Sequence, residues 1–270
     1  MRSSWRAYDD WKATTNPGPS ELAGILDREY IRKGSQGVQD FIPNRIISSD
    51  ALAKKILADP KYYESIRANT ERIQALVPTI RASLKRLKEL YPDAVFPPVY
   101  FVVGRRNSGG TSSTNGLIVG AEMFADEGSR LRFDGLVPTV VHELIHYQQQ
   151  ATGVDLTTQA MKEGAADFVA EMITGTDTNE DLKTYGDAHE QELWTKFQQD
   201  RDKSDLSSWL YNYDNPGRNT PPDLGYYIGY KICQSFYEIS SDKSAAIQSI
   251  IAMKNPKEII EKSGYAQRFH

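Results

Sequence analysis

The sequence contains little cysteine, little histidine and no long apolar run, and basic residues do not dominate its charge. The single cysteine, Cys233, excludes a disulfide bond within the chain, and no flanking histidine would activate its thiol for catalysis. No apolar run reaches the length of a membrane-spanning helix, so we expect no transmembrane segment. The formal net charge of −4 gives no broad basic surface, and we therefore expect no nucleic-acid partner.

The composition is that of a folded domain. With 270 residues, of which 39% are hydrophobic and 25% charged, the chain is long enough to bury a substantial core. Its first ten residues lack the apolar stretch of a signal peptide. A chain from which an export signal had been removed would read the same way, so a periplasmic or lipoprotein origin stays open. The sequence does not predict an oligomeric state.

Apolar residues repeat at helical spacing through most of the chain, and only its middle has strand patterns. We predict helices near residues 20–33, 49–57 and 60–90, with Pro78 kinking or dividing the last one. Strands are predicted at residues 99–104 and 116–124, joined by a loop. We expect residues 1–92 to be a helical region that forms one wall of a cleft. Residues 93–270 would be the catalytic region, and the two regions would make one compact unit.

One short segment points to a reaction. His142, Glu143 and His146 form the pattern H-E-x-x-H and use two of the four histidines in the chain. On an α-helix, residues four apart project from the same face, so both imidazoles can reach one tetrahedral zinc ion. Glu143 follows the first ligand and lies beside the metal, where it can act on a water molecule as general base. The apolar residues of the same helix predict a buried stripe: Val140, Val141, Leu144 and Ile145.

A second helical pattern follows and supplies the predicted third ligand, Glu163. Sixteen residues separate it from His146 (163 − 146 − 1), enough to end one helix, turn and return antiparallel beside it. Two histidines and one glutamate leave the fourth zinc position open for water, as in catalytic sites. Asp167 lies one turn beyond Glu163 and is predicted to accept the free ring N–H of His142 or His146. Glu171 is a second candidate for either role, and a solvated row of acids is the structural alternative.

These two segments resemble the gluzincin branch of the zincin metallopeptidases, in which the third ligand is a glutamate on the next helix. The resemblance implies His142, His146 and Glu163 as zinc ligands, Glu143 as general base and Asp167 as a supporting residue. The chain is also similar to an uncharacterised bacterial family of predicted zinc-dependent proteases related to gliding-motility lipoproteins. That likeness rests on EGAADFVAE at 163–171 and GYYIGY at 225–230, and it covers roughly the second half of the chain.

The resemblance implies an α+β, mostly helical chain with a zincin-like fold and a small sheet beside the metal-binding helix. In that layout an edge strand pairs with an extended substrate through main-chain hydrogen bonds. The two strand patterns that precede the metal helix are in keeping with it. A loop containing Gly109 and Gly110 joins them, and without a lysine–serine pair or a following helix start we expect a mobile loop or a hairpin turn rather than a phosphate cradle.

Hydrolysis also needs a hydrogen-bond donor for the oxyanion of the tetrahedral intermediate. The best source is a helix near the C-terminus, where Gly225 and Gly229 clear one face for close approach to the metal helices. Tyr226 and Tyr230 flank that face and are the candidates, although core packing is as good an explanation for either tyrosine. The alternatives for the donor are weaker: His189, which has polar neighbours, and Arg218, in a turn.

We therefore predict a zinc-dependent peptidase that cleaves a peptide or protein substrate with a metal-activated water. Two alternatives stay open. A non-proteolytic binding or assembly protein could keep the zincin scaffold, although it would have no need of Glu143. A zinc amidohydrolase acting on a non-peptide amide could use the same site. The sequence does not indicate the cleavage preference, or whether cleavage is internal or terminal.

Overall fold

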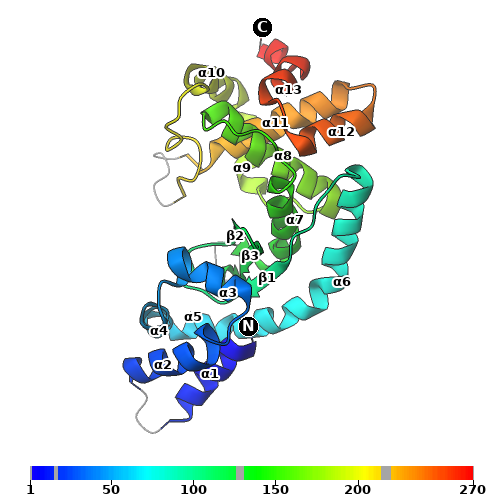
Figure 1. Cartoon of the computed structure of the whole chain (residues 1–270). Coiled ribbons are helices and arrows are strands. Elements are labelled where there is room, and N and C mark those ends of the chain that lie inside the picture. Colours follow the sequence, from blue (N-terminus) through cyan, green and yellow to red (C-terminus); the bar gives the residue numbers. More distant parts are fainter. Residues whose placement is uncertain (1, 15–17, 126–130, 214–219, 270) are drawn as a thin grey trace. The chain divides into compact units, whose positions relative to one another are not determined.

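The computed structural model describes residues 2–14, 18–125, 131–213 and 220–269. It is mostly helical and contains one three-stranded sheet, so the α+β prediction is confirmed (Figure 1). The chain forms two compact units. Unit 1 contains residues 1–81 and 96–143, and unit 2 contains residues 82–95 and 144–270. Two helices, α6 (Arg67–Leu90) and α7 (Leu136–His146), each have residues in both units.

Unit 1 begins with helices around a core of aromatic and aliphatic side chains. Ser48 caps α4 by accepting a hydrogen bond from the Ala51 amide, and Asp59 caps α5 in the same way through Tyr62. The helix predicted over 60–90 is divided into two helices, the first of which, α5, ends at Ser65. The second, α6, runs through Pro78 without a break. Of the two effects predicted for Pro78, the division is therefore wrong, and the kink stays a prediction. Before α6, the helices are α1 (Arg2–Lys12), α2 (Pro19–Leu26), α3 (Gln36–Phe41), α4 (Ser49–Ala58) and α5 (Pro60–Ser65).

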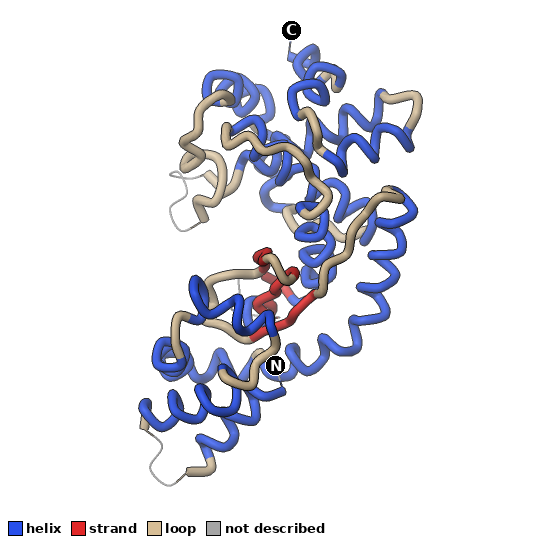
Figure 2. Tube along the Cα trace, in the orientation of Figure 1, coloured by secondary structure: helices blue, strands red, loops and turns tan. Residues whose placement is uncertain are grey.

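The sheet of unit 1 contains β1 (Val99–Val102), β2 (Gly110–Ser113) and β3 (Gly116–Gly120). Its strand order is β1-β3-β2, with β1 parallel and β2 antiparallel to β3. The strands are the red segments in Figure 2, where most of the trace is helical. The prediction of a loop at 110–113 is wrong, because these residues pair with β3 and form an edge strand of this sheet. The predicted strand over 116–124 stops at Gly120, where a 3-10 turn (Ala121–Met123) leads into a short parallel pair, β4 (Phe124–Ala125) and β5 (Leu131–Arg132).

Unit 2 is built on two helices that cross at glycines. A Cβ atom on Gly164 of α8 would lie 2.1 Å from the Tyr230 amide nitrogen, and one on Gly229 of α11 would lie 1.9 Å from the Ala160 carbonyl oxygen. The prediction that Gly229 permits close approach to the helix of Glu163 is confirmed, whereas Gly225 faces Leu210. The helices are α8 (Leu156–Thr174), α9 (Glu180–Ala188), α10 (Glu190–Asp200), α11 (Leu224–Ile239), α12 (Lys243–Ala252) and α13 (Pro256–Lys262).

Cys233 is fully buried in α11, and burial raises the pKa of its thiol, as expected of a core residue rather than a nucleophile. None of the helices in the described part of the chain combines the length and the apolar character that a membrane crossing requires.

Candidate metal centre

Helix α7 presents the H-E-x-x-H residues from its polar side. Its apolar face is fully buried, through Val140, Val141, Leu144 and Ile145, which confirms the predicted stripe. His142, Glu143 and His146 are only partly buried. The buried face fixes the rotation of the helix about its axis, so the three polar side chains are held on the opposite side.

Helix α8 brings Glu163 to the last turn of α7. The Nε2 atom of His146 lies 3.3 Å from Oε2 of Glu163, and the Glu163 side chain is only 9% exposed. One ligand atom from each of His142, His146 and Glu163 lies within 4.8 Å of the others. Zinc–nitrogen and zinc–oxygen bonds of about 2.0–2.2 Å in a tetrahedron place two ligand atoms roughly 3.3–3.5 Å apart. The separation between His146 and Glu163 falls in this range, and it is also that of a His–Glu ion pair.

The second oxygen of Glu163 accepts a hydrogen bond from a tyrosine that sequence reasoning missed. The Oη atom of Tyr211 donates to Oε1 of Glu163 at 2.6 Å. The Tyr211 backbone has a φ of 58°, in the left-handed region that costs a bulky residue about 1–2 kcal/mol. Next to it, Asn212 and Asp223 exchange two hydrogen bonds between side chain and backbone, which holds this loop to the start of α11. No periodic pattern marks Tyr211, because it lies on an irregular loop.

The ring of His146 has a neighbour that the sequence did not predict. Its Nδ1 atom lies 2.9 Å from Oε1 of Gln149, whose Nε2 atom donates to the Lys162 carbonyl oxygen at 2.7 Å. Asp167 accepts a hydrogen bond from Asn179 at 2.6 Å. The support that Asp167 would give to His142 stays a prediction. The spacing of Gln149, three residues after His146 at the helix end, is the only local signal that pointed to it.

Glu143 lies against the backbone of the edge strand β2. A Cβ atom on Gly110 would lie 2.4 Å from Oε1 of Glu143, so any larger residue at this position would displace the carboxylate. This contact explains why a glycine occupies position 110, which the sequence alone did not reveal. It also brings the predicted base beside the first residue of a strand that pairs with β3.

The two predicted oxyanion donors occupy different surroundings. Desolvation raises the pKa of the partly buried Tyr226 phenol well above its usual value, and the charges of Glu163 and Asp167 raise it further. Tyr226 is therefore close to the candidate ligand group. Tyr230 is buried against Phe168, at 5.5 Å between ring centroids, and the Lys183 ammonium lies 3.7 Å from its ring centroid.

Lys183 also forms ion pairs with Glu171 and with Asp177. Burial raises the pKa of Tyr230 to about 12, and the Lys183 charge opposes that rise. The hydrogen-bonding group of Tyr230 is thus the one formed by Glu171 and Lys183. Glu171, the alternative to Glu163 and Asp167, takes part in this ion-pair group.

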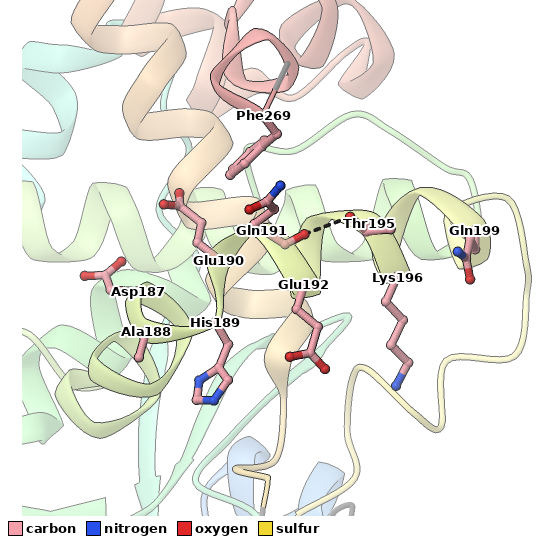
Figure 3. Close-up of a pocket in the computed structure, with 10 residues that line it drawn as sticks. All are labelled: Asp187, Ala188, His189, Glu190, Gln191, Glu192, Thr195, Lys196, Gln199 and Phe269. Atoms are coloured by element: carbon pink, nitrogen blue, oxygen red, sulfur yellow. Dashed lines mark hydrogen bonds between the residues drawn. The ribbon is translucent and has the colours of Figure 1, made fainter.

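His189 lies in a separate pocket of unit 2. The pocket has a volume of about 830 Å³, and its lining comes from the junction of α9 with α10 and from Phe269 (Figure 3). The His189 ring stacks on Tyr185 at 4.1 Å, and its Nδ1 atom lies 2.8 Å from the Tyr185 carbonyl oxygen. None of the predicted zinc ligands is among the lining residues of this pocket. The other weak candidate, Arg218, lies outside the described residues.

Comparison with known proteins places the chain in a family. The family model described as gliding motility protein GldB matches residues 26–267, which is most of the chain and includes every predicted site residue. Neither the search of curated proteins nor the search of solved structures returned a match. The expected relation to gliding-motility lipoproteins is confirmed, and it extends well beyond the second half of the chain. The chain belongs to the gliding motility protein GldB family.

Proposed function

We propose that the chain is a zinc-dependent peptidase with a gluzincin-like site on a zincin-like fold. The observation that carries the proposal is the pairing of His146 Nε2 with Glu163 Oε2 at 3.3 Å, in one group with His142. The residues fit a zinc ion by donor type, because imidazole nitrogen and carboxylate oxygen are both zinc ligands. His142, His146 and Glu163 would hold the ion. When bound, zinc lowers the pKa of a water molecule towards about 7 and polarises a carbonyl oxygen.

Glu143 acts as the general base in this proposal. Its carboxylate takes a proton from the attacking water and passes it to the leaving nitrogen. The absence of a side chain at Gly110 gives the carboxylate room beside β2. An extended peptide could pair with this edge strand through backbone hydrogen bonds, which would hold a scissile bond near Glu143 irrespective of side chains. Peptide and protein substrates are therefore the class that we propose.

The oxyanion donor is better sought near Glu163 than in the Lys183 group. The charges of Glu163 and Asp167 raise the pKa of the Tyr226 phenol, and the Tyr211 hydroxyl donates a hydrogen bond to Glu163. Tyr230 interacts instead with Glu171 and Lys183. Of the two tyrosines predicted from sequence, we propose Tyr226 for the oxyanion role.

A second candidate function is supported by the family match. The chain belongs to a family described by gliding motility, and a non-proteolytic binding or assembly protein on the same scaffold is in keeping with that description. Such a protein could bind zinc without using Glu143 for catalysis. A zinc amidohydrolase acting on another amide would use the same residues, so its substrate alone would distinguish it.

The test is cleavage of a diverse peptide library by the zinc-loaded chain, with and without a chelator, alongside the Glu143→Gln variant. We expect the chelator to stop cleavage, and Glu143→Gln to lower the rate by roughly 10²–10⁴-fold at unchanged zinc content. Equal rates for wild type and Glu143→Gln would remove Glu143 from the mechanism. A wild-type chain that binds zinc and cleaves no peptide would favour the assembly protein or the other amidohydrolase.

A further inference from the structure

We propose that Gln149 is the positioning residue of the site: it fixes which nitrogen of His146 carries the proton and ties His146 to the helix of Glu163. The proposal rests on the proposed zinc site. It concerns a residue with no predicted role in catalysis or in binding the metal. Gln149 lies just beyond the end of α7, where the backbone has left the helix and the side chain can turn back.

The orientation of the Gln149 amide follows from its partners. The Lys162 carbonyl oxygen can only accept a hydrogen bond, so the amide NH₂ group must face it, at 2.7 Å. The amide oxygen then faces Nδ1 of His146, at 2.9 Å. Because an amide oxygen can only accept, Nδ1 must carry the proton. A carbonyl on one helix thus determines the tautomer of a histidine on the other.

This tautomer prepares Nε2 of His146 for a metal. In a neutral ring protonated at Nδ1, Nε2 has a free lone pair, and here it faces the Glu163 carboxylate oxygen at 3.3 Å. Two such acceptors repel each other unless a cation lies between them. The alternative is a doubly protonated, charged ring that forms an ion pair with Glu163. Only the neutral ring is a zinc ligand.

Gln149 also acts on Glu163, through the backbone of the preceding residue. Lys162 directly precedes Glu163 on α8, so the hydrogen bond to its carbonyl holds the helical turn from which the carboxylate projects. One side chain therefore contacts the ring of one ligand and the backbone next to another. Metal ligands are commonly oriented by such partners, whose loss weakens metal affinity about 10–100-fold.

The test compares zinc dissociation constants, measured by competition with a chromophoric chelator, for wild type and three variants of the full chain. Gln149→Met keeps the length of the side chain and removes both hydrogen bonds, so we expect binding weaker by about 10–100-fold. Gln149→Glu keeps an acceptor for Nδ1–H but sets a carboxylate oxygen against the Lys162 carbonyl oxygen, so it should keep the His146 tautomer and lose the hydrogen bond to α8. Gln150→Met is the control, since Gln150 is exposed and, among the described residues, its one hydrogen bond runs from its backbone amide to the Ala252 carbonyl oxygen.

Two further measurements separate positioning from folding and from the proposed function. Long-range ¹H–¹⁵N spectra of the zinc-free chain, at a pH where the ring is neutral, should show the His146 proton on Nδ1 in wild type and a mixture of tautomers in Gln149→Met. Equal zinc affinity for Gln149→Met and wild type would overturn the proposal, as would an unchanged His146 tautomer in zinc-free Gln149→Met. Should Gln149→Met fail to fold, the spectrum of the zinc-free wild type still decides, since a His146 proton on Nε2 would overturn the proposal. A wild-type chain that binds no zinc would instead overturn the proposed function.

Discussion

Two buried glutamates show how differently this chain uses a carboxylate. Glu163 has one oxygen bonded to Tyr211 and the other facing His146, and both partners come from separate elements. Glu122 is fully buried, and the Arg106 amide donates to its Oε1 at 3.1 Å. Within the described part of the chain no group donates a hydrogen bond to Oε2 of Glu122. Burial alone therefore does not distinguish the proposed metal ligand, whereas Glu163 differs from Glu122 in having partners from a separate helix and from a loop.

The surroundings of Glu122 explain its separate role. Cβ atoms on Gly104 and Gly120 would lie 2.9 and 3.3 Å from its two oxygens, so backbone encloses the carboxyl closely. Burial raises the pKa of Glu122 to about 7, against the opposing effect of its backbone hydrogen bonds. Glu122 therefore anchors the loop that leads from β1 to β2.

The largest expected effect is on the zinc content of the chain, which should depend on Glu163 and not on Glu122. Glu163→Ala should reduce zinc from about one ion per chain to near zero, because a two-histidine site lacks the anionic ligand. Glu122→Gln should leave the zinc content unchanged. Metal analysis of both purified variants checks this. Zinc retained by Glu163→Ala, or lost from Glu122→Gln, would contradict the separate roles of the two glutamates.

The next effect is a pH dependence of the free energy of unfolding, caused by the titration of Glu122. The pKa of the carboxyl is about 7 in the folded chain and about 4.5 when it is unfolded, so the folded state holds the extra proton between these values. The free energy of unfolding should therefore fall as the pH rises from about 4.5 through 7, by up to about 3 kcal/mol, and then level off.

Glu122→Gln should remove this contribution. Urea unfolding of wild type and variant at several pH values between 4.5 and 8 measures the difference between them. A difference that does not change with pH would mean that Glu122 does not titrate in this range.

The phenols near Glu163 give the third test. Tyr226→Phe should lower kcat by roughly 10²-fold as an oxyanion donor is lost, with little change in zinc affinity. Tyr211→Phe should weaken zinc binding by about 10-fold, because it removes a hydrogen bond that orients the ligand carboxylate. Tyr230→Phe is the matched control, since its hydroxyl interacts with Glu171 and Lys183. A larger loss of kcat in Tyr230→Phe than in Tyr226→Phe would assign the oxyanion role to Tyr230 instead.

The smallest effect concerns the backbone beside Glu122. The Tyr62 hydroxyl donates to the Glu122 carbonyl oxygen at 2.6 Å in a buried position. Tyr62→Phe keeps the ring under the Arg106 guanidinium and should lower the free energy of unfolding by about 1 kcal/mol. Thermal unfolding monitored by circular dichroism measures this change. Zinc content should not respond, and a metal-deficient Tyr62→Phe would contradict the separation of the two acids.

The sequence by itself determined the parts of the site that depend on short-range spacing. The interval of four between His142 and His146, the apolar stripe of α7 and the helix of Glu163 all follow from helical periodicity, which is a local property. The mostly helical class followed for the same reason. The strand at 110–113 escaped prediction because its glycine and serines show no apolar alternation.

Only the tertiary structure decided which other residues meet these ligands. Tyr211 reaches Glu163 from a loop 48 residues along the chain, and Gln149 joins His146 to the backbone of α8. Glu122 lies in a segment that the sequence predicted to be strand, and a 3-10 turn directs it inward. Such contacts join segments far apart in sequence, and each depends on the packing of whole helices. Such packing is not encoded in local patterns, which therefore predicted the candidate ligands but not the side chains that contact them.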